Sequence, residues 1–284
     1  MFHPVTGIDH CVALTQDLDS TAEKYRAMGF RLSPRGTHSK AKGSANYTIM
    51  FPQDYFEILG FIAETEVNAP RREMLATMGE GLHAISCRIE NANAAANGLA
   101  DLGLKTQELN SFSRPVPRPD GSEEVASFST LTFSPSEVPF GSVFMCEHKT
   151  PDVVWMPELL DHPNGACGLD AVLAISDTPE QDALKFARLW AHGSVSESEG
   201  CYNVATGPNS AALLLFTKEK LAKLFPDADF DSTARGAFAG IRIKTSDTER
   251  LTAFLTESQI PYSVSLGSVY LCPQNSSGIL LEFV

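Results

Sequence analysis

The chain has 284 residues, of which 35 are acidic and 22 basic, so its formal net charge is −13. This acidic balance argues against nucleic acid and anionic membranes as partners, because both are bound through clusters of Lys and Arg. No apolar run reaches the roughly 18 residues that a membrane-spanning helix needs, and no signal peptide is visible at the start. The six cysteines are scattered without a C-x-x-C pair, so we expect reduced thiols and a cytoplasmic protein.

The first predicted unit is one strand, one helix and three strands. A short buried strand covers Gly7 to Leu14, and Asp17 begins a helix that runs to about Met28. Gly29 follows as the residue that ends this helix. Three strands are then expected, over residues 31–34, 45–51 and 55–61.

The same order recurs from Gly81. A strand is expected over residues 82–89 and a helix over 92–102, followed by strands near 104–109, 126–133 and 142–148. Arg114 to Gly121 contains three prolines and an Asp-Gly pair, which predict a long loop or a hairpin tip. The second unit therefore has the same element order as the first.

Two further copies follow. The third has a strand from Asp170, a helix over 180–191 and strands over 200–205 and 211–217, and a short helix over 218–225 leads to the fourth. The fourth has strands over 239–245, 262–265, 268–272 and 278–283, with a helix over 247–258. Three prolines and one glycine in residues 150–165 mark a domain boundary. We therefore expect a first pair of modules in 1–150, a linker in 151–165 and a second pair in 166–284.

In all four copies, seven residues separate one first-strand position from an acidic residue near the start of the helix. That first-strand position holds His10, His83, Asp170 and Gly240. The middle of the last strand holds Glu57, Glu147, an apolar residue and Glu282. A carboxylate in an apolar strand is costly unless it is paired or binds a metal. Two imidazoles and two carboxylates suit a divalent ion such as Zn, Ni, Mn or Fe.

The alternatives to this ligand set stay open. His10 is a core histidine in the simplest reading, and Glu57 then forms a salt bridge. The second helix ends one residue later than the first, and a one-residue slip turns His83 to the other face of its strand. His148 instead of Glu147 is the functional residue if the last strand of the second copy faces the other way.

The combination of strings in this chain resembles the vicinal-oxygen-chelate superfamily, most closely its bacterial glyoxalase-like domain proteins. The strings are IDH at 8–10, GSAN at 43–46, YFEILG at 55–60, and CEHKTPDVVW with HPNGA at 146–155 and 162–166. The resemblance implies an α+β fold of four βαβββ modules paired into two cup-shaped half-barrels. It also implies that His10, Glu57, His83 and Glu147 are metal ligands, with Glu57 and Glu147 as candidate bases. The chain departs from the small glyoxalases in having four modules, and from extradiol dioxygenases in lacking ligands in the second pair.

Other residues are weaker candidates. Asn46 is expected to point into the cup, and Arg114 and Arg118 to close over an anionic substrate, although a solvated loop is the simpler reading. Alternation places Cys11 and Cys146 in the core on the opposite face from the ligands. His38 is interpreted as a surface residue.

The leading functional hypothesis is a metal-dependent, glyoxalase-like lyase or isomerase that acts on a small oxygenated substrate with a glutamate as base. Ring-cleaving, extradiol-type dioxygenation with Fe(II) or Mn(II) is one alternative. The other is a metal-free small-molecule binding protein, similar to bleomycin-resistance proteins. Four modules in one chain are compatible with a monomer or a homodimer.

Overall fold

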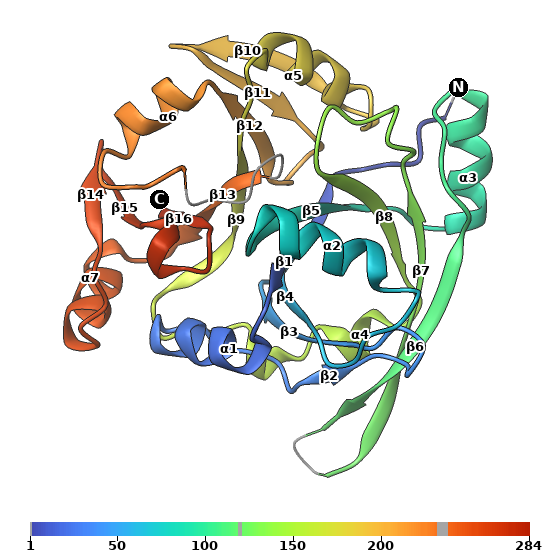
Figure 1. The fold of residues 1–284 in the computed structure, drawn as a ribbon, viewed down its shortest axis with the longest axis horizontal. Helices are drawn as coiled ribbons and strands as arrows, with labels where there is room; N and C mark the ends of the chain where they lie inside the picture. Colours follow the sequence, from blue (N-terminus) through green and yellow to red (C-terminus); the bar gives the residue numbers. More distant parts are fainter. Residues whose placement is uncertain (1, 119–120, 232–237) are drawn as a thin grey trace.

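The computed structural model describes residues 2–118, 121–231 and 238–284, and contains the four expected βαβββ modules (Figure 1). The first half comprises β1 (Ile8–Thr15), α1 (Leu18–Ala27), β2 (Gly36–Thr37), β3 (Ser44–Met50), β4 (Tyr55–Phe61), α2 (Ala69–Met78), β5 (Gly81–Arg88), α3 (Ala92–Asp101), β6 (Asn110–Pro117), β7 (Glu123–Thr132) and β8 (Ser142–His148). The second half comprises β9 (Ala166–Ile175), α5 (Pro179–Ala187), β10 (Ser194–Ser198), β11 (Cys201–Ala205), β12 (Ala212–Phe216), α6 (Lys218–Leu224), β13 (Phe238–Thr245), α7 (Thr248–Glu257), β14 (Ser263–Ser265), β15 (Ser268–Leu271) and β16 (Leu280–Phe283). The α+β class is therefore confirmed.

Each module is closed by the same pairing. Its first strand runs parallel to its last, as β1 does with β4, β5 with β8, β9 with β12 and β13 with β16. Antiparallel pairing of β1 with β5 joins the first two modules, and pairing of β9 with β13 joins the other two. A single pair of residues, Phe238 and Leu82, connects β13 to β5 and makes the sheet continuous across the halves. Figure 1 shows the halves side by side, with α1, α3, α5 and α7 at the periphery.

The caps in the sequence set the helix limits. The side chain of Asp17 accepts a hydrogen bond from Ser20 N at the start of α1, and that of Asn91 accepts one from Ala94 N at the start of α3. Gly29 and Gly103 follow these helices at φ of +86° and +73°, which is the left-handed region that favours glycine. The predicted starts and stops of α1 and α3 are therefore correct to about one residue, whereas the helix predicted over 180–191 ends four residues early as α5.

The proline-rich segment differs from its prediction. Residues 110–117 form β6, an edge strand that pairs only with β7, so Pro115 and Pro117 do not interrupt a ladder on a second side. No strand forms at 104–109, where Thr106 makes one isolated bridge to Phe133. The predicted turn residues Pro119 and Asp120 lie outside the described residues.

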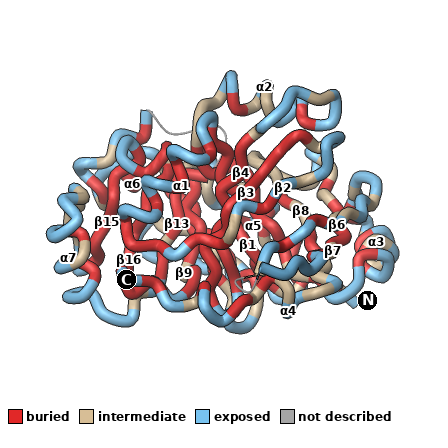
Figure 2. Tube along the Cα trace, turned by 90° about the horizontal axis from the view of Figure 1, so that it is seen from below, coloured by how far each residue is buried: buried red, intermediate tan, exposed pale blue. Residues whose placement is uncertain are grey.

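Helix α2, which the sequence analysis missed, lies across the first half. Figure 1 shows it over the middle of that half, and Figure 2 shows it at the surface, outside the buried strands. Its one buried side chain is Leu75, which packs with Val12, Leu14, Leu59 and Ala84. A helix with a single buried residue has little apolar periodicity to reveal it.

The sheet of the first half therefore has two distinct faces. Cys11, Ala13 and Ile58 belong to the large core under the peripheral helices. Val12, Leu14 and Leu59 alternate with them and face α2. This second face also carries the candidate site, because His10 and Glu57 have the same parity along their strands as Val12 and Leu59.

The segment between the halves is bound to the first half. It contains α4 (Pro151–Val154) and η1 (Pro157–Leu159), and Trp155 Nε1 donates a hydrogen bond to Phe51 O at 3.0 Å. His162 Nδ1 accepts from Arg31 N at 2.9 Å, so its Nε2 carries the proton and donates to Met50 O at 2.9 Å. His162 is thus a structural residue of this segment. No helix in the described part of the chain is long and apolar enough to cross a membrane.

Candidate functional site

A β-bulge in β1 places two consecutive side chains together. Along the ladder between β1 and β5, Ile8 pairs with Cys87 and His10 pairs with Ser86, which leaves Asp9 as an extra residue. Side chains of a regular strand alternate between faces, and an extra residue interrupts that alternation. Asp9 can therefore reach the imidazole of the residue that follows it.

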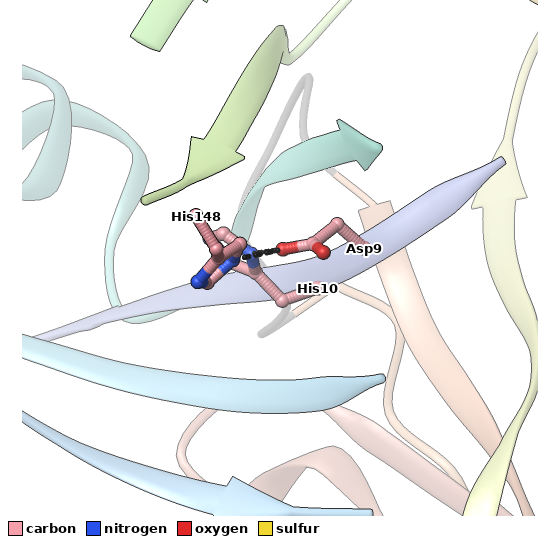
Figure 3. Close-up of side chains that lie close together, drawn as sticks. All are labelled: Asp9, His10 and His148. Atoms are coloured by element: carbon pink, nitrogen blue, oxygen red, sulfur yellow. Dashed lines mark hydrogen bonds and ion pairs between the residues drawn. The ribbon is translucent and has the colours of Figure 1, made fainter. Parts of the chain in front are cut away.

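Asp9, His10 and His148 form a buried triad (Figure 3). Oδ2 of Asp9 lies 2.6 Å from His10 Nδ1 and 2.9 Å from Nε2 of His148, which ends β8. An ionised carboxylate only accepts hydrogen bonds, so each imidazole donates an N–H to it. Asp9 and His10 are 2% and 3% exposed, so these hydrogen bonds replace contacts with water.

The two histidines keep Asp9 ionised. Burial alone raises the pKa of this carboxyl group, but the charge of His148 and the hydrogen bonds from both imidazoles outweigh burial. The pKa of Asp9 is consequently held far below its usual range. Each imidazole is in turn oriented by the carboxylate, which leaves His10 Nε2 and His148 Nδ1 as the ring nitrogens that do not bind Asp9.

The free nitrogen of His10 faces Tyr55 and Glu57 on β4. The rings of His10 and Tyr55 are stacked with centroids 4.2 Å apart, and the Tyr55 hydroxyl lies 3.5 Å from His10 Nε2. Glu57 Oε2 lies 3.7 Å from the same nitrogen. Asn46 Nδ2 on β3 donates to the other oxygen, Oε1, at 2.7 Å. This arrangement holds one Glu57 oxygen and leaves the other directed at His10.

The other two expected ligands lie elsewhere. Glu147 Oε2 accepts a hydrogen bond from Ala92 N at 2.9 Å and so binds the first turn of α3, on the opposite side of β8 from the triad. The ring of His83 bonds Gly79 O at 2.9 Å. The structure therefore brings His10 and Glu57 together and brings neither His83 nor Glu147 to them.

Strand register explains both displacements. His10 pairs with Tyr55 and Glu57 follows two residues later, while in the second module Ser86 pairs with Phe144 and Cys146 follows two residues later. His148 of β8 contacts Asp9, so Glu147, the preceding residue of the strand, points to the other face. A second register shift between Val12 and Ala13 leaves His83 unpaired in the ladder, and seven-residue counting cannot detect it. The expectation that Cys146 lies on the face opposite the site is wrong, because Cys146 is two residues before His148 on β8 and packs with Tyr55, whereas Cys11 does lie in the core.

Two residues of the triad were not in the predicted ligand set. His148 was the alternative to Glu147, and the register of β8 favours it. Asp9 was missed, although a carboxylate inside the apolar string GIDHCVAL signals a buried charge that needs a partner. His38 was assigned to the surface, but it is half-buried, its Nδ1 bonds Ser44 Oγ at 2.9 Å, and burial lowers its pKa to about 4.

The three candidate substrate-binding residues lie in different environments. Asn46 is buried and holds Glu57, as described. Arg114 is buried at 8% exposure on β6, and not on a solvated loop. Arg118, at the hairpin tip, forms an ion pair with Glu124.

The triad has donors that a divalent metal uses. Within the described residues, Asp9, His10 and His148 are the one group of three or more His, Cys, Asp or Glu whose ligand atoms lie within 4.8 Å of one another. Two imidazoles and a carboxylate suit Zn, Ni, Mn or Fe. If His10 binds through Nδ1, its Nε2 proton faces the carboxylate of Glu57, an arrangement typical of metal-bound histidines. By donor chemistry the residues fit such an ion.

Among residues 166–231 and 238–284, which the structure describes, no equivalent group of donors is present. The position of His10 is taken by Gly240, which pairs with Leu280. Arg242 Nε donates to Glu282 Oε2 at 2.7 Å, so this carboxylate already has a cationic partner. The candidate site is accordingly confined to the first half.

A family model described as a glyoxalase-like domain matches residues 8–212. The chain belongs to this family. The match covers all of the first half and most of the third module, so it includes the triad, Glu57 and Asn46. The resemblance to the vicinal-oxygen-chelate superfamily is thereby confirmed.

Solved structures support the same fold for this glyoxalase-like protein. A hypothetical protein from Staphylococcus aureus matches with a TM-score of 0.65 and 11% identity, over 98% of each chain. A mutant of 4-hydroxymandelate synthase from Streptomyces coelicolor matches with a TM-score of 0.62 and 10% identity, over 99% of this chain and 92% of that one. At such identities the likeness concerns the fold alone. No curated protein matches the chain by sequence.

Proposed function

We propose that this glyoxalase-like protein is a metal-dependent lyase or isomerase that moves a proton on a small oxygenated substrate. Asp9, His10 and His148 would hold the divalent ion, and Glu57 would be the base. The observation that carries the proposal is the buried triad beside a carboxylate that is fixed through only one of its oxygens.

Each side chain of the site would have a distinct role in this reaction. A bound ion would polarise substrate oxygens and lower the cost of negative charge on them. Asn46 holds Oε1 of Glu57, so Oε2 is the atom placed to accept a proton from the substrate. The stacked ring of Tyr55 and the surrounding apolar side chains exclude water from His10.

Metal analysis tests the ion and the ligand set together. Protein purified without chelator and equilibrated with Zn, Ni, Mn or Fe(II) should retain about one ion per chain. Asp9→Asn and His148→Gln should lose it, while His83→Gln should retain it, because His83 is a buried histidine of the same half that bonds a backbone carbonyl. Retention by His148→Gln together with loss in His83→Gln would refute the triad as the ligand set.

Proton exchange tests the base. Loaded protein should accelerate exchange of the C–H protons of hydroxyacetone in D2O, followed by NMR. Glu57→Gln should keep the ion and slow this exchange by 10²-fold or more, which is about the contribution of a positioned base. Equal exchange in Glu57→Gln and the unsubstituted protein would rule out Glu57 as the base.

A metal-free binding protein is the second candidate. The distances of 2.6 and 2.9 Å in the triad are hydrogen-bond lengths, so protons alone satisfy the three side chains. Absence of any retained ion under all loading conditions would favour this reading over the enzyme.

A further inference from the structure

Three cations surround Glu57 in a protein whose net charge is −13. Lys42, Arg71 and Arg114 each interact electrostatically with Glu57. They come from three different elements, because Lys42 precedes β3, Arg71 is in the first turn of α2 and Arg114 is in β6. One carboxylate against three cations leaves a local excess of positive charge.

Arg114 is the buried member of this cluster, and Glu57 is near enough to attract it, but no described carboxylate forms a close ion pair with it. It is 8% exposed, and none of the described residues forms an ion pair or a side-chain hydrogen bond with its guanidinium. Some arginines of the first half differ from Arg114 in this respect, since Arg35 is paired with Asp19 and Arg72 with Glu64. A buried guanidinium without a close ion pair is costly, so Arg114 retains the capacity to bind a further anion.

A glycine makes room for Arg114 beside the candidate site. A Cβ atom on Gly36 would lie 2.8 Å from Arg114 Nη1 and 2.3 Å from Asn46 Oδ1. Arg114 and Asn46 thus approach the same point of β2, and Asn46 Oδ1 is buried without a hydrogen-bond partner. Because Asn46 Nδ2 binds Glu57, the guanidinium is adjacent to the proposed base.

The other two basic residues add positive charge near Glu57, Lys42 from a half-buried position and Arg71 from an exposed one. Lys42 Nζ lies 2.9 Å from the centroid of the Phe112 ring. Burial, and then the charge of Arg71, lower the pKa of Lys42 to about 8, so a bound anion would relieve an unfavourable charge. Arg71 is carried by α2, the helix that lies across this face of the sheet (Figure 1).

We propose that the substrate carries a carboxylate, which Arg114 binds at this place, with Lys42 and Arg71 adding positive charge. The proposal deepens the proposed function, since it names the substrate class of the same site. The planar guanidinium matches the two oxygens of a carboxylate. Bound there, the carboxylate would hold the rest of the substrate beside Glu57 and His10.

The test compares two probes that differ mainly in charge. Benzoate and benzamide are titrated calorimetrically into the full chain at low salt. Benzoate should bind at least about tenfold more tightly than benzamide, and added NaCl should weaken only benzoate. Arg114→Gln should lower benzoate affinity about tenfold or more. Arg114→Lys should have an affinity between those of Arg114→Gln and the unsubstituted protein. Arg118→Gln is the matched control, because Arg118 is paired with Glu124, and it should bind benzoate unchanged.

Two further measurements separate this proposal from the others. His148→Gln should bind benzoate within about twofold of the unsubstituted protein, so a failure of the metal hypothesis leaves the carboxylate site intact. Arg114→Gln without ligand should unfold at the same or a higher temperature, because it removes an unpaired buried cation. Equal binding of benzoate and benzamide, an equal loss in Arg118→Gln, or tighter binding of inorganic phosphate than of benzoate would overturn the carboxylate assignment.

Discussion

The Asp9 carboxylate should be one of the most stabilising single groups in the molecule. The substitution Asp9→Asn tests this without leaving a cavity, because the two side chains have nearly the same size. The substitution removes the charge while one amide oxygen can still accept from one imidazole. The other imidazole N–H then faces an NH2 group. Hydrogen bonds to a charged group contribute about 1.5–3 kcal/mol each. Losing one and weakening the other should lower the free energy of unfolding by about 3–5 kcal/mol, similar to breaking a buried ion pair.

Urea denaturation at pH 7 in the presence of a chelator measures this loss apart from any metal. With a slope of about 2–3 kcal/mol/M, the midpoint should fall by about 1–2 M urea. Asp101→Asn, at an exposed position at the end of α3, is the control and should change the midpoint little.

The stability that Asp9 contributes should decrease as the pH falls. The pKa of Asp9 is lower in the folded protein than in the unfolded chain, so its stabilisation is complete above about pH 4 and is lost as the pH falls below that value. The difference between Asp9→Asn and the unsubstituted protein should therefore narrow in acid. A loss below about 1 kcal/mol at pH 7, or a difference that grows in acid, would contradict the triad.

Two more predictions concern residues outside the triad. Glu147→Gln should lower the free energy of unfolding by about 1 kcal/mol, because a weaker acceptor then caps Ala92 N, and should leave metal content unchanged; metal loss in this variant would restore Glu147 as a ligand. Lys42, with its pKa lowered to about 8, should be acetylated at pH 8.5 faster than the exposed Lys40, as measured by peptide mass spectrometry; equal rates would show that Lys42 is not perturbed. Because its folded pKa is depressed, Lys42 should also make stability rise between about pH 8 and pH 10.5.

The modules could be predicted from the sequence because their signals are local. Caps such as Asp17 and stops such as Gly29 and Gly103 depend on a few neighbouring residues, and the apolar strands between them repeat in a fixed order. Helix α2 was not predicted, because one buried leucine gives no periodic apolar pattern. The same local reasoning placed His10 and Glu57 on one face, where the structure has them.

The second half of the predicted ligand set depended on register, which is not a local property. The bulges at Asp9 and near His83 arise where β1 meets β5, so neither strand shows them alone. His83 is skipped in that ladder, and Glu147 points toward α3 because His148, the next residue of β8, contacts Asp9. The unpaired state of Arg114 likewise depends on β2, β3 and β6 meeting around Gly36.

The extra residue in β1 has a consequence for how proteins built this way can diverge. Deleting one residue there would restore regular alternation and send Asp9 and His10 to opposite faces, even if every side chain of the triad were retained. A change in the number of residues between β6 and β7 would not alter the alternation within β1. In relatives that keep this triad, the spacing within β1 should therefore be more restricted than the identity of most residues around it.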